Sequence, residues 1–108
     1  MATANPLILS KFRAALDALY GRRIERIVLY GSRARDDARE DSDYDVAVFS
    51  DGISSAKERW QEVDRISLAA SNITTETGGV IHAMPYQAGS YKEHTPLMHE
   101  LRREDIDL

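Results

Sequence analysis

Apolar side chains recur every three or four residues in three stretches of this chain, which is the spacing of helices with one buried face. The first stretch covers residues 6–20 and has proline in its first turn. The second covers residues 55–71 and places Trp60 on the expected buried face. The third covers residues 96–103 and is the shortest. These patterns predict three helices, each packed through one apolar stripe against the rest of the domain.

Three shorter stretches have the composition of strands. Residues 26–30 are almost wholly apolar, which is typical of a strand that is buried on both faces. Residues 44–49 place three bulky apolar side chains on one face, and residues 80–84 form a third stretch that ends at Pro85. A further short helix is expected over residues 33–38. This alternation of helices and strands predicts an α/β (α+β) domain in which helices flank a small mixed sheet.

Length and composition indicate one soluble domain. The chain has 108 residues, 43% hydrophobic and 30% charged, so residues 1–108 are expected to form a single domain with a disordered start at residues 1–5. It has no cysteine, no apolar run long enough for a bilayer and no secretory signal, so we expect a cytoplasmic protein without membrane association. A net charge of −4 argues against direct binding to nucleic acid. Residues 22–39 are nevertheless basic, with six arginines against three acidic residues.

A Gly31-Ser32 pair follows the first expected strand and lies within this basic segment. Glycine lets the backbone approach a ligand closely, and the free N–H groups at the start of the next helix favour phosphate oxygens. The Ser32 hydroxyl and the guanidinium groups of Arg33 and Arg35 can add hydrogen bonds to the same anion. The pair therefore indicates a phosphate-binding turn, although a Gly-Ser pair serves equally as an ordinary helix N-cap.

Asp43 and Asp45 stand at the start of the second expected strand. Side chains two residues apart on a strand point the same way, so the two carboxylates would share one face with Ala47. Carboxylates held close together repel each other unless a cation lies between them, and magnesium takes hard oxygen ligands of this kind. The simpler alternative is an acidic boundary between loop and strand. That alternative is weakened because Asp45 leads directly into an apolar strand, where an unpaired charge is costly.

Together, the phosphate-binding turn and the two carboxylates describe a site for metal-assisted attack of a hydroxyl on a nucleoside triphosphate. The spacing of Gly31-Ser32, ten residues and Asp43-x-Asp45 resembles the signature of the DNA polymerase beta-like nucleotidyltransferase superfamily. The words YGSRAR at residues 30–35 and SDYDVAV at residues 42–48 resemble the minimal nucleotidyltransferase (MNT) group in particular, and so does the segment over residues 96–108. The resemblance extends over nearly the whole chain and implies a single palm-like domain.

This resemblance implies an activity and a partner. Members of the MNT group transfer a nucleoside monophosphate, commonly AMP from ATP, to a hydroxyl and release pyrophosphate. Many are antitoxins paired with a toxin that has a HEPN domain, a helical ribonuclease, and some adenylylate a tyrosine of that toxin. Carried over to this chain, Gly31 and Ser32 would hold the triphosphate of ATP, and Asp43 and Asp45 would bind two magnesium ions.

The chain departs from the family pattern at a third carboxylate, which active members usually take from a later strand. Residues 80–84 are the corresponding strand, and they contain no acidic residue. His82 stands in that place, where a neutral imidazole can accept a proton from a hydroxyl near pH 7, although histidine is a poor ligand for magnesium. A histidine that merely packs in the strand is the alternative. Glu76 is a second candidate, because it would reach the site if the strand began earlier.

Aromatic residues outside the motif are expected to serve packing. Trp60 lies on the apolar stripe of its helix and is assigned to the core, because the chain has few aromatic residues in any basic stripe that could stack on bases. Tyr86 and Tyr91 follow the third strand near the mouth of the site, where surface packing is preferred over stacking on the nucleotide base.

Three functions remain open. The first is a magnesium-dependent nucleotidyltransferase that acts as the antitoxin to a HEPN toxin, with its site completed by that partner or by a second copy of the chain. The second is a binding module of the same fold that neutralises its partner by occlusion, which the missing third carboxylate favours. The third, a transferase acting on a small molecule, is disfavoured by the short chain. The open part of the sheet and the helix over residues 96–103 are the candidate contact surfaces.

Overall fold

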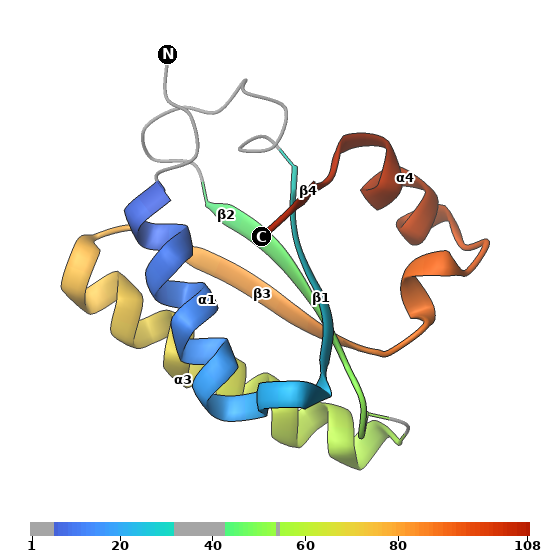
Figure 1. The fold of residues 1–108 in the computed structure, drawn as a ribbon, viewed down its shortest axis with the longest axis horizontal. Coiled ribbons are helices and arrows are strands. Elements are labelled where there is room, and N and C mark those ends of the chain that lie inside the picture. Colours follow the sequence, from blue (N-terminus) through green and yellow to red (C-terminus); the bar gives the residue numbers. More distant parts are fainter. Residues whose placement is uncertain (1–5, 32–42, 54) are drawn as a thin grey trace.

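Helices of the expected kind are present in the computed structural model, which describes residues 6–31, 43–53 and 55–108 (Figure 1). The α-helices are α1 (Pro6–Tyr20), α3 (Ala56–Thr77) and α4 (Pro96–Glu104), and two short 3₁₀ turns are η1 (Gly21–Arg23) and η2 (Ser90–Lys92). Within these ranges, no helix combines the length and the apolar character needed to cross a membrane.

The predicted bounds of α1 and α4 are confirmed. The Thr95 side chain caps α4 by accepting from the backbone N–H of Met98, and proline occupies the first turn, where its missing N–H costs nothing. The helix expected over residues 33–38 and the disorder expected at residues 1–5 lie outside the described residues.

α3 begins where the sequence predicts and continues beyond the expected end at residue 71. Its start is a capping box: the Ser55 hydroxyl accepts from the N–H of Glu58, and the Glu58 carboxylate accepts from the N–H of Ser55. In the last turns, three threonine hydroxyls donate back to carbonyls one turn earlier, which satisfies these polar groups within the helix. The predicted end was wrong because buried Ile73 extends the apolar stripe through a run of otherwise polar residues.

The described strands form a mixed four-stranded sheet with the order β3-β2-β1-β4. They are β1 (Ile24–Tyr30), β2 (Tyr44–Ser50), β3 (Ile81–Gln87) and β4 (Ile106–Asp107). β1 is antiparallel to β2 and β4, whereas β2 and β3 are parallel and are joined by the α3 crossover. The predicted α+β class, with helices flanking a mixed sheet, is confirmed. β4 was not predicted, because two residues are too few to show a period.

The two faces of the sheet carry separate cores. α1 and α3 lie side by side over one face, and α4 packs on part of the other (Figure 1). The core under α1 and α3 includes Phe12, Leu16, Ile27, Leu29, Val46, Val48, Ile66, Ala70 and Ile73. The core under α4 consists of Val28, Ala47, Phe49, Met98 and Leu101. Alternate positions of β1 and β2 thus fill both faces, as expected for strands that are buried on both sides.

β3 forms one edge of the sheet and continues through Pro85 instead of ending there. The Pro85 carbonyl oxygen accepts from Arg59 Nε of α3 at 3.3 Å, on the side away from β2. The nitrogen and the carbonyl of one strand residue face the same side, so the missing N–H of proline also faces outward, where no strand requires it. The prediction that the strand ends at Pro85 was wrong because an edge strand tolerates proline.

Trp60 is not in the core, contrary to the prediction. Its side chain is 70% exposed, whereas Ile66 on the same helix is fully buried. Six residues separate the two, which places them about 120° apart around the helix axis. The buried face of α3 therefore includes Ile66 and Ala70, as predicted, but leaves Trp60 at the surface.

Candidate active site

Asp45 and His82 lie beside each other on neighbouring strands. Backbone pairing sets Tyr30 of β1 opposite Asp45 of β2, and Asp45 opposite His82 of β3, so the three residues form one row across the sheet, the Tyr30–Asp45–His82 row. The His82 Nδ1 atom is 3.6 Å from Asp45 Oδ1, an ion-pair distance when the imidazole is protonated. Tyr44 and Val46, the residues on either side of Asp45 in β2, belong to the core under α1 and α3. Because successive side chains of a strand point to opposite faces, the row faces away from α1 and α3.

Gly31 begins the turn after β1 and packs directly against Asp45. Its φ of 75° lies in the left-handed region, which glycine adopts at little cost. A Cβ atom at this position would lie 2.5 Å from Asp45 Oδ2, closer than side chains approach. Glycine therefore lets the backbone of the turn come close to the Asp45 carboxylate. The turn and the carboxylate, which the sequence assigned to one site, are in contact.

Asp43 is exposed and immediately precedes β2, two residues before Asp45. It therefore lies on the loop that enters the strand at the same end of the sheet as the row. Ser32, Arg33 and Arg35, the other residues expected to bind the nucleotide, lie outside the described residues. Of the residues predicted to form the phosphate-binding turn, the structure therefore describes Gly31.

Glu76 does not join the row. It lies in the last turn of α3, and its carboxylate pairs with Nζ of Lys11 on α1. Both residues belong to the helix layer, on the face of the sheet opposite to His82. Of the two side chains considered for the place of the third carboxylate, His82 is the one that lies beside Asp45.

Tyr30 is a member of the row that the sequence analysis missed. Burial, followed by the nearby Tyr86 and Asp45 side chains, raises the pKa of Tyr30 to about 12. Its hydroxyl therefore stays protonated even in mildly alkaline solution, where it can still donate a hydrogen bond. Its position directly before Gly31 could have indicated a place in the site. However, residues 27–30 are all apolar or aromatic, so the sequence shows no alternation of polar and apolar side chains that would assign Tyr30 to one face of the strand.

Tyr86 and Tyr91 pack against Phe49 on the α4 side of the sheet. Their ring centroids lie 5.4 Å and 5.6 Å from that of Phe49, stacked and edge-on respectively. The guanidinium of Arg26 lies 4.0 Å from the centre of the Tyr91 ring, and that of Arg59 lies 5.4 Å from the centre of the Tyr86 ring. These contacts favour the expected packing role over stacking on a nucleotide base.

The carboxylates of Asp43 and Asp45 suit magnesium better than a transition metal. Asp43 and Asp45 offer hard carboxylate oxygens, whereas histidine is a weak ligand for this ion. In the part of the chain that the structure describes, no three His, Asp or Glu side chains are grouped to hold a metal. Magnesium commonly binds through one or two carboxylates and completes its shell with substrate phosphates and water. The two aspartates therefore fit an ion that binds together with a nucleotide.

Comparison with known families identifies a nucleotidyltransferase domain in this chain. The model of the nucleotidyltransferase domain family matches residues 9–78, which is more than half of the chain. The matched range contains Gly31, Asp43 and Asp45, and it ends before β3 and His82. No curated protein sequence matches the chain.

Several solved structures share the fold at low sequence identity. A chain of a toxin–antitoxin complex with AMP-PNP has a TM-score of 0.63 and 16% identity, with 91% of this chain and 69% of that chain covered. A candidate nucleotidyltransferase from Sulfolobus solfataricus has a TM-score of 0.61 and 16% identity, with 94% and 76% covered. A chain from a complex of a tri-AMPylated Shewanella oneidensis HEPN toxin with an MNT antitoxin has a TM-score of 0.58 and 16% identity. The match covers 94% of this chain and 68% of that chain. These similarities to solved structures show the fold. The family match over residues 9–78 shows that the chain belongs to the nucleotidyltransferase domain family.

Proposed function

We propose that this chain is a magnesium-dependent nucleotidyltransferase that transfers AMP from ATP to a hydroxyl of a HEPN-type toxin, as the antitoxin of that pair. The observation that carries the proposal is the meeting of Gly31, Asp45 and His82 at one end of the sheet, in a chain of the nucleotidyltransferase family. Two fold neighbours support the partner, since one is a toxin–antitoxin complex with AMP-PNP and another contains a tri-AMPylated HEPN toxin.

ATP would bind with its triphosphate at the Gly31 turn. The absence of a side chain there lets phosphate oxygens approach the backbone, and Ser32 would add a hydroxyl donor. Asp43 and Asp45 would hold magnesium. When bound, magnesium supplies positive charge that offsets the negative charge developing on the phosphates during transfer.

The acceptor hydroxyl would lose its proton beside His82. Its oxygen forms a bond to the α-phosphorus while the bond from that phosphorus to pyrophosphate breaks. The Nδ1 atom of His82 faces Asp45 Oδ1, which leaves Nε2 to accept the proton of the hydroxyl. Asp45 Oδ1 would hold the imidazole in this orientation, while Oδ2 lies at the Gly31 turn.

A label-transfer assay tests this function. The chain is incubated with magnesium and a purified HEPN-domain protein from the same host, with ATP labelled at either the α- or the γ-phosphate. We expect label on the HEPN protein from the α position alone, because AMP is transferred and pyrophosphate carries the γ-phosphate away. Label from the γ position, or no label from either, would contradict the proposed activity.

One observation favours a second function, a binding module that inhibits by occlusion: a histidine stands opposite Asp45, where active family members are expected to carry an acid. A binding module would block the HEPN ribonuclease without ATP or magnesium, and inhibition would end when it is removed. A transferase needs both, and its inhibition persists after removal because the toxin is covalently modified. Ribonuclease activity before and after removal of the chain separates the two.

Replacing His82 with aspartate should raise the transfer rate about tenfold and lower the magnesium concentration that gives half-maximal rate. The new carboxylate would lie opposite Asp45 on β3, and oxygen is a better donor to magnesium than imidazole. Aspartate can also accept the proton of the acceptor hydroxyl. Rates are measured over a series of magnesium concentrations, with His99→Asp, at an exposed position of α4, as the control for added charge. A His82→Asp variant no faster than the wild type would show that the third-acid position lies elsewhere.

A further inference from the structure

The Tyr30–Asp45–His82 row gives the reaction a direction across the sheet. Gly31, Asp45 and His82 stand on or directly after three successive strands, β1, β2 and β3. In phosphoryl transfer, the attacking and leaving oxygens lie roughly in line on opposite sides of phosphorus. With the triphosphate at Gly31, pyrophosphate leaves on the β1 side and the acceptor hydroxyl arrives on the β3 side. β3 is an edge of the described sheet, so a protein acceptor has to approach around this edge.

An apolar hollow of about 290 Å³ lies on the same edge, between α3 and β3. It is lined by Ala56, Arg59, Trp60, Val63 and Met84. Met84 follows His82 by two residues on the same face of β3, about 7 Å along the strand. Trp60 is 70% exposed at this hollow, although it is the largest apolar side chain of the protein. The hollow is therefore open, apolar and next to the side from which the acceptor arrives.

Side chains, rather than the backbone of β3, would make the contact at this edge. Pro85 has no N–H to donate, and its carbonyl oxygen already accepts from Arg59, so addition of a partner strand is blocked there. The second neighbour of the Arg59 guanidinium is the Tyr86 ring. Within the described ranges, both of these neighbours are neutral, so the positive charge of Arg59 can attract a carboxylate on a partner.

We propose that the acceptor protein docks on the β3 edge, with an apolar side chain inserted between Trp60 and Met84 and a carboxylate against Arg59. This rests on the proposed transferase function, because the docked surface brings the acceptor hydroxyl to His82. Exposed tryptophan and arginine around an apolar hollow are the residue types that contribute most to binding between proteins. The partner surface should therefore carry the acceptor hydroxyl, and an apolar side chain and an acidic side chain should lie close to that hydroxyl.

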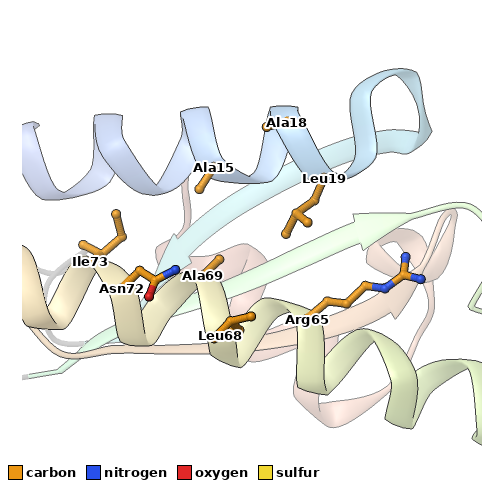
Figure 2. Close-up of a pocket in the computed structure, with 8 residues that line it drawn as sticks. All are labelled: Ala15, Ala18, Leu19, Arg65, Leu68, Ala69, Asn72 and Ile73. Atoms are coloured by element: carbon orange, nitrogen blue, oxygen red, sulfur yellow. The ribbon is translucent and has the colours of Figure 1, made fainter.

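A second apolar hollow, of about 320 Å³, provides a matched comparison (Figure 2). It lies between α1 and α3, and its apolar lining is Ala15, Ala18, Leu19, Leu68, Ala69 and Ile73. The two helices cover the face of the sheet opposite to the row, so a partner seated here would not bring a hydroxyl to His82. Leu68 is 66% exposed and lies on the same helix as Trp60, so Leu68→Ala controls for the loss of an exposed apolar side chain.

The experiment compares Trp60→Ala with Leu68→Ala in two reactions of the full chain. One is α-label transfer to the purified HEPN-domain protein, and the other is release of AMP and pyrophosphate with water as the acceptor. We expect Trp60→Ala to lower transfer to the protein at least about tenfold while AMP release stays within about twofold of wild type. Leu68→Ala should change neither. Retained AMP release also shows that each variant is folded.

A photo-crosslinking residue at position 60 or 68 detects docking without catalysis. In an Asp43→Asn background, we expect a crosslink to the HEPN protein from position 60 and none from position 68. This result supports the docking surface even when the wild-type chain transfers no label, which is how failure of the proposed function would show itself. A crosslink from position 68 alone, a crosslink to a second copy of the chain alone, or undiminished protein labelling by Trp60→Ala would overturn the proposal.

Discussion

Replacing Asp43 with asparagine is expected to abolish nucleotidyl transfer while the domain stays folded. Asparagine keeps the size of the side chain but removes the negative charge with which it would hold magnesium, so charge on the transferring phosphates is no longer offset. We expect a loss of at least about 10³-fold in rate. Asp43 is exposed and precedes β2, so the free energy of unfolding should change by no more than about 0.5 kcal/mol.

Asp51→Asn is the matched control for this variant. Asp51 is also exposed, but it follows β2 at the opposite end, where its N–H donates to the Arg23 carbonyl at 3.0 Å. Its backbone contact survives the substitution, and transfer should stay at the wild-type rate. Rates come from α-label transfer, and stability comes from urea unfolding. An Asp43→Asn chain that keeps more than a tenth of the wild-type rate would remove Asp43 from the proposed site.

Replacing Gly31 with alanine should impair both stability and transfer. A non-glycine residue at a φ of 75° costs about 1–2 kcal/mol in unfolding free energy. The added Cβ would also lie 2.5 Å from Asp45 Oδ2, so the carboxylate or the turn has to move. A displacement near 1 Å in a reacting site costs about 10²-fold in rate, and we expect a loss of that size.

Gly21→Ala separates the two effects. Gly21 has a φ of 55°, so alanine there meets a similar backbone strain, but nothing lies within 4 Å of its added Cβ. Urea unfolding should show a comparable loss of stability for both variants, whereas label transfer should fall for Gly31→Ala alone. Equal transfer by the two alanine variants would mean that the contact between Gly31 and Asp45 does not matter for the reaction.

These variants also distinguish the two functions considered for the chain. A transferase loses its inhibition of the HEPN ribonuclease when Asp43 or Gly31 is changed, because modification of the toxin stops. A binding module keeps that inhibition in both variants and loses it when the docking surface is changed. Trp60→Ala, which is exposed and lies outside the row, should weaken inhibition under either function, so Asp43→Asn and Gly31→Ala are the variants that separate the two.

Much of the fold could be predicted because the relevant signals are local. The spacing of apolar residues in α1 and α4 lies within a few turns, and the Ser55 capping box marks the start of α3 within four residues. The Gly31-Ser32 and Asp43-x-Asp45 motif is also confined to a short stretch, so its residue types and spacing were enough to indicate the family.

What could not be predicted depends on segments that are far apart in the chain. The family resemblance placed His82 at the site, but the register that sets it opposite Asp45 comes from the parallel pairing of β2 and β3 across the α3 crossover, which no local pattern contains. Tyr30 joins them through the antiparallel register of β1 and β2. The exposure of Trp60 depends on which side of α3 meets the sheet, and Pro85 is tolerated because β3 happens to be an edge. Helix and strand periods record which side chains are apolar, but burial and pairing follow from the lowest free energy of the whole packed chain.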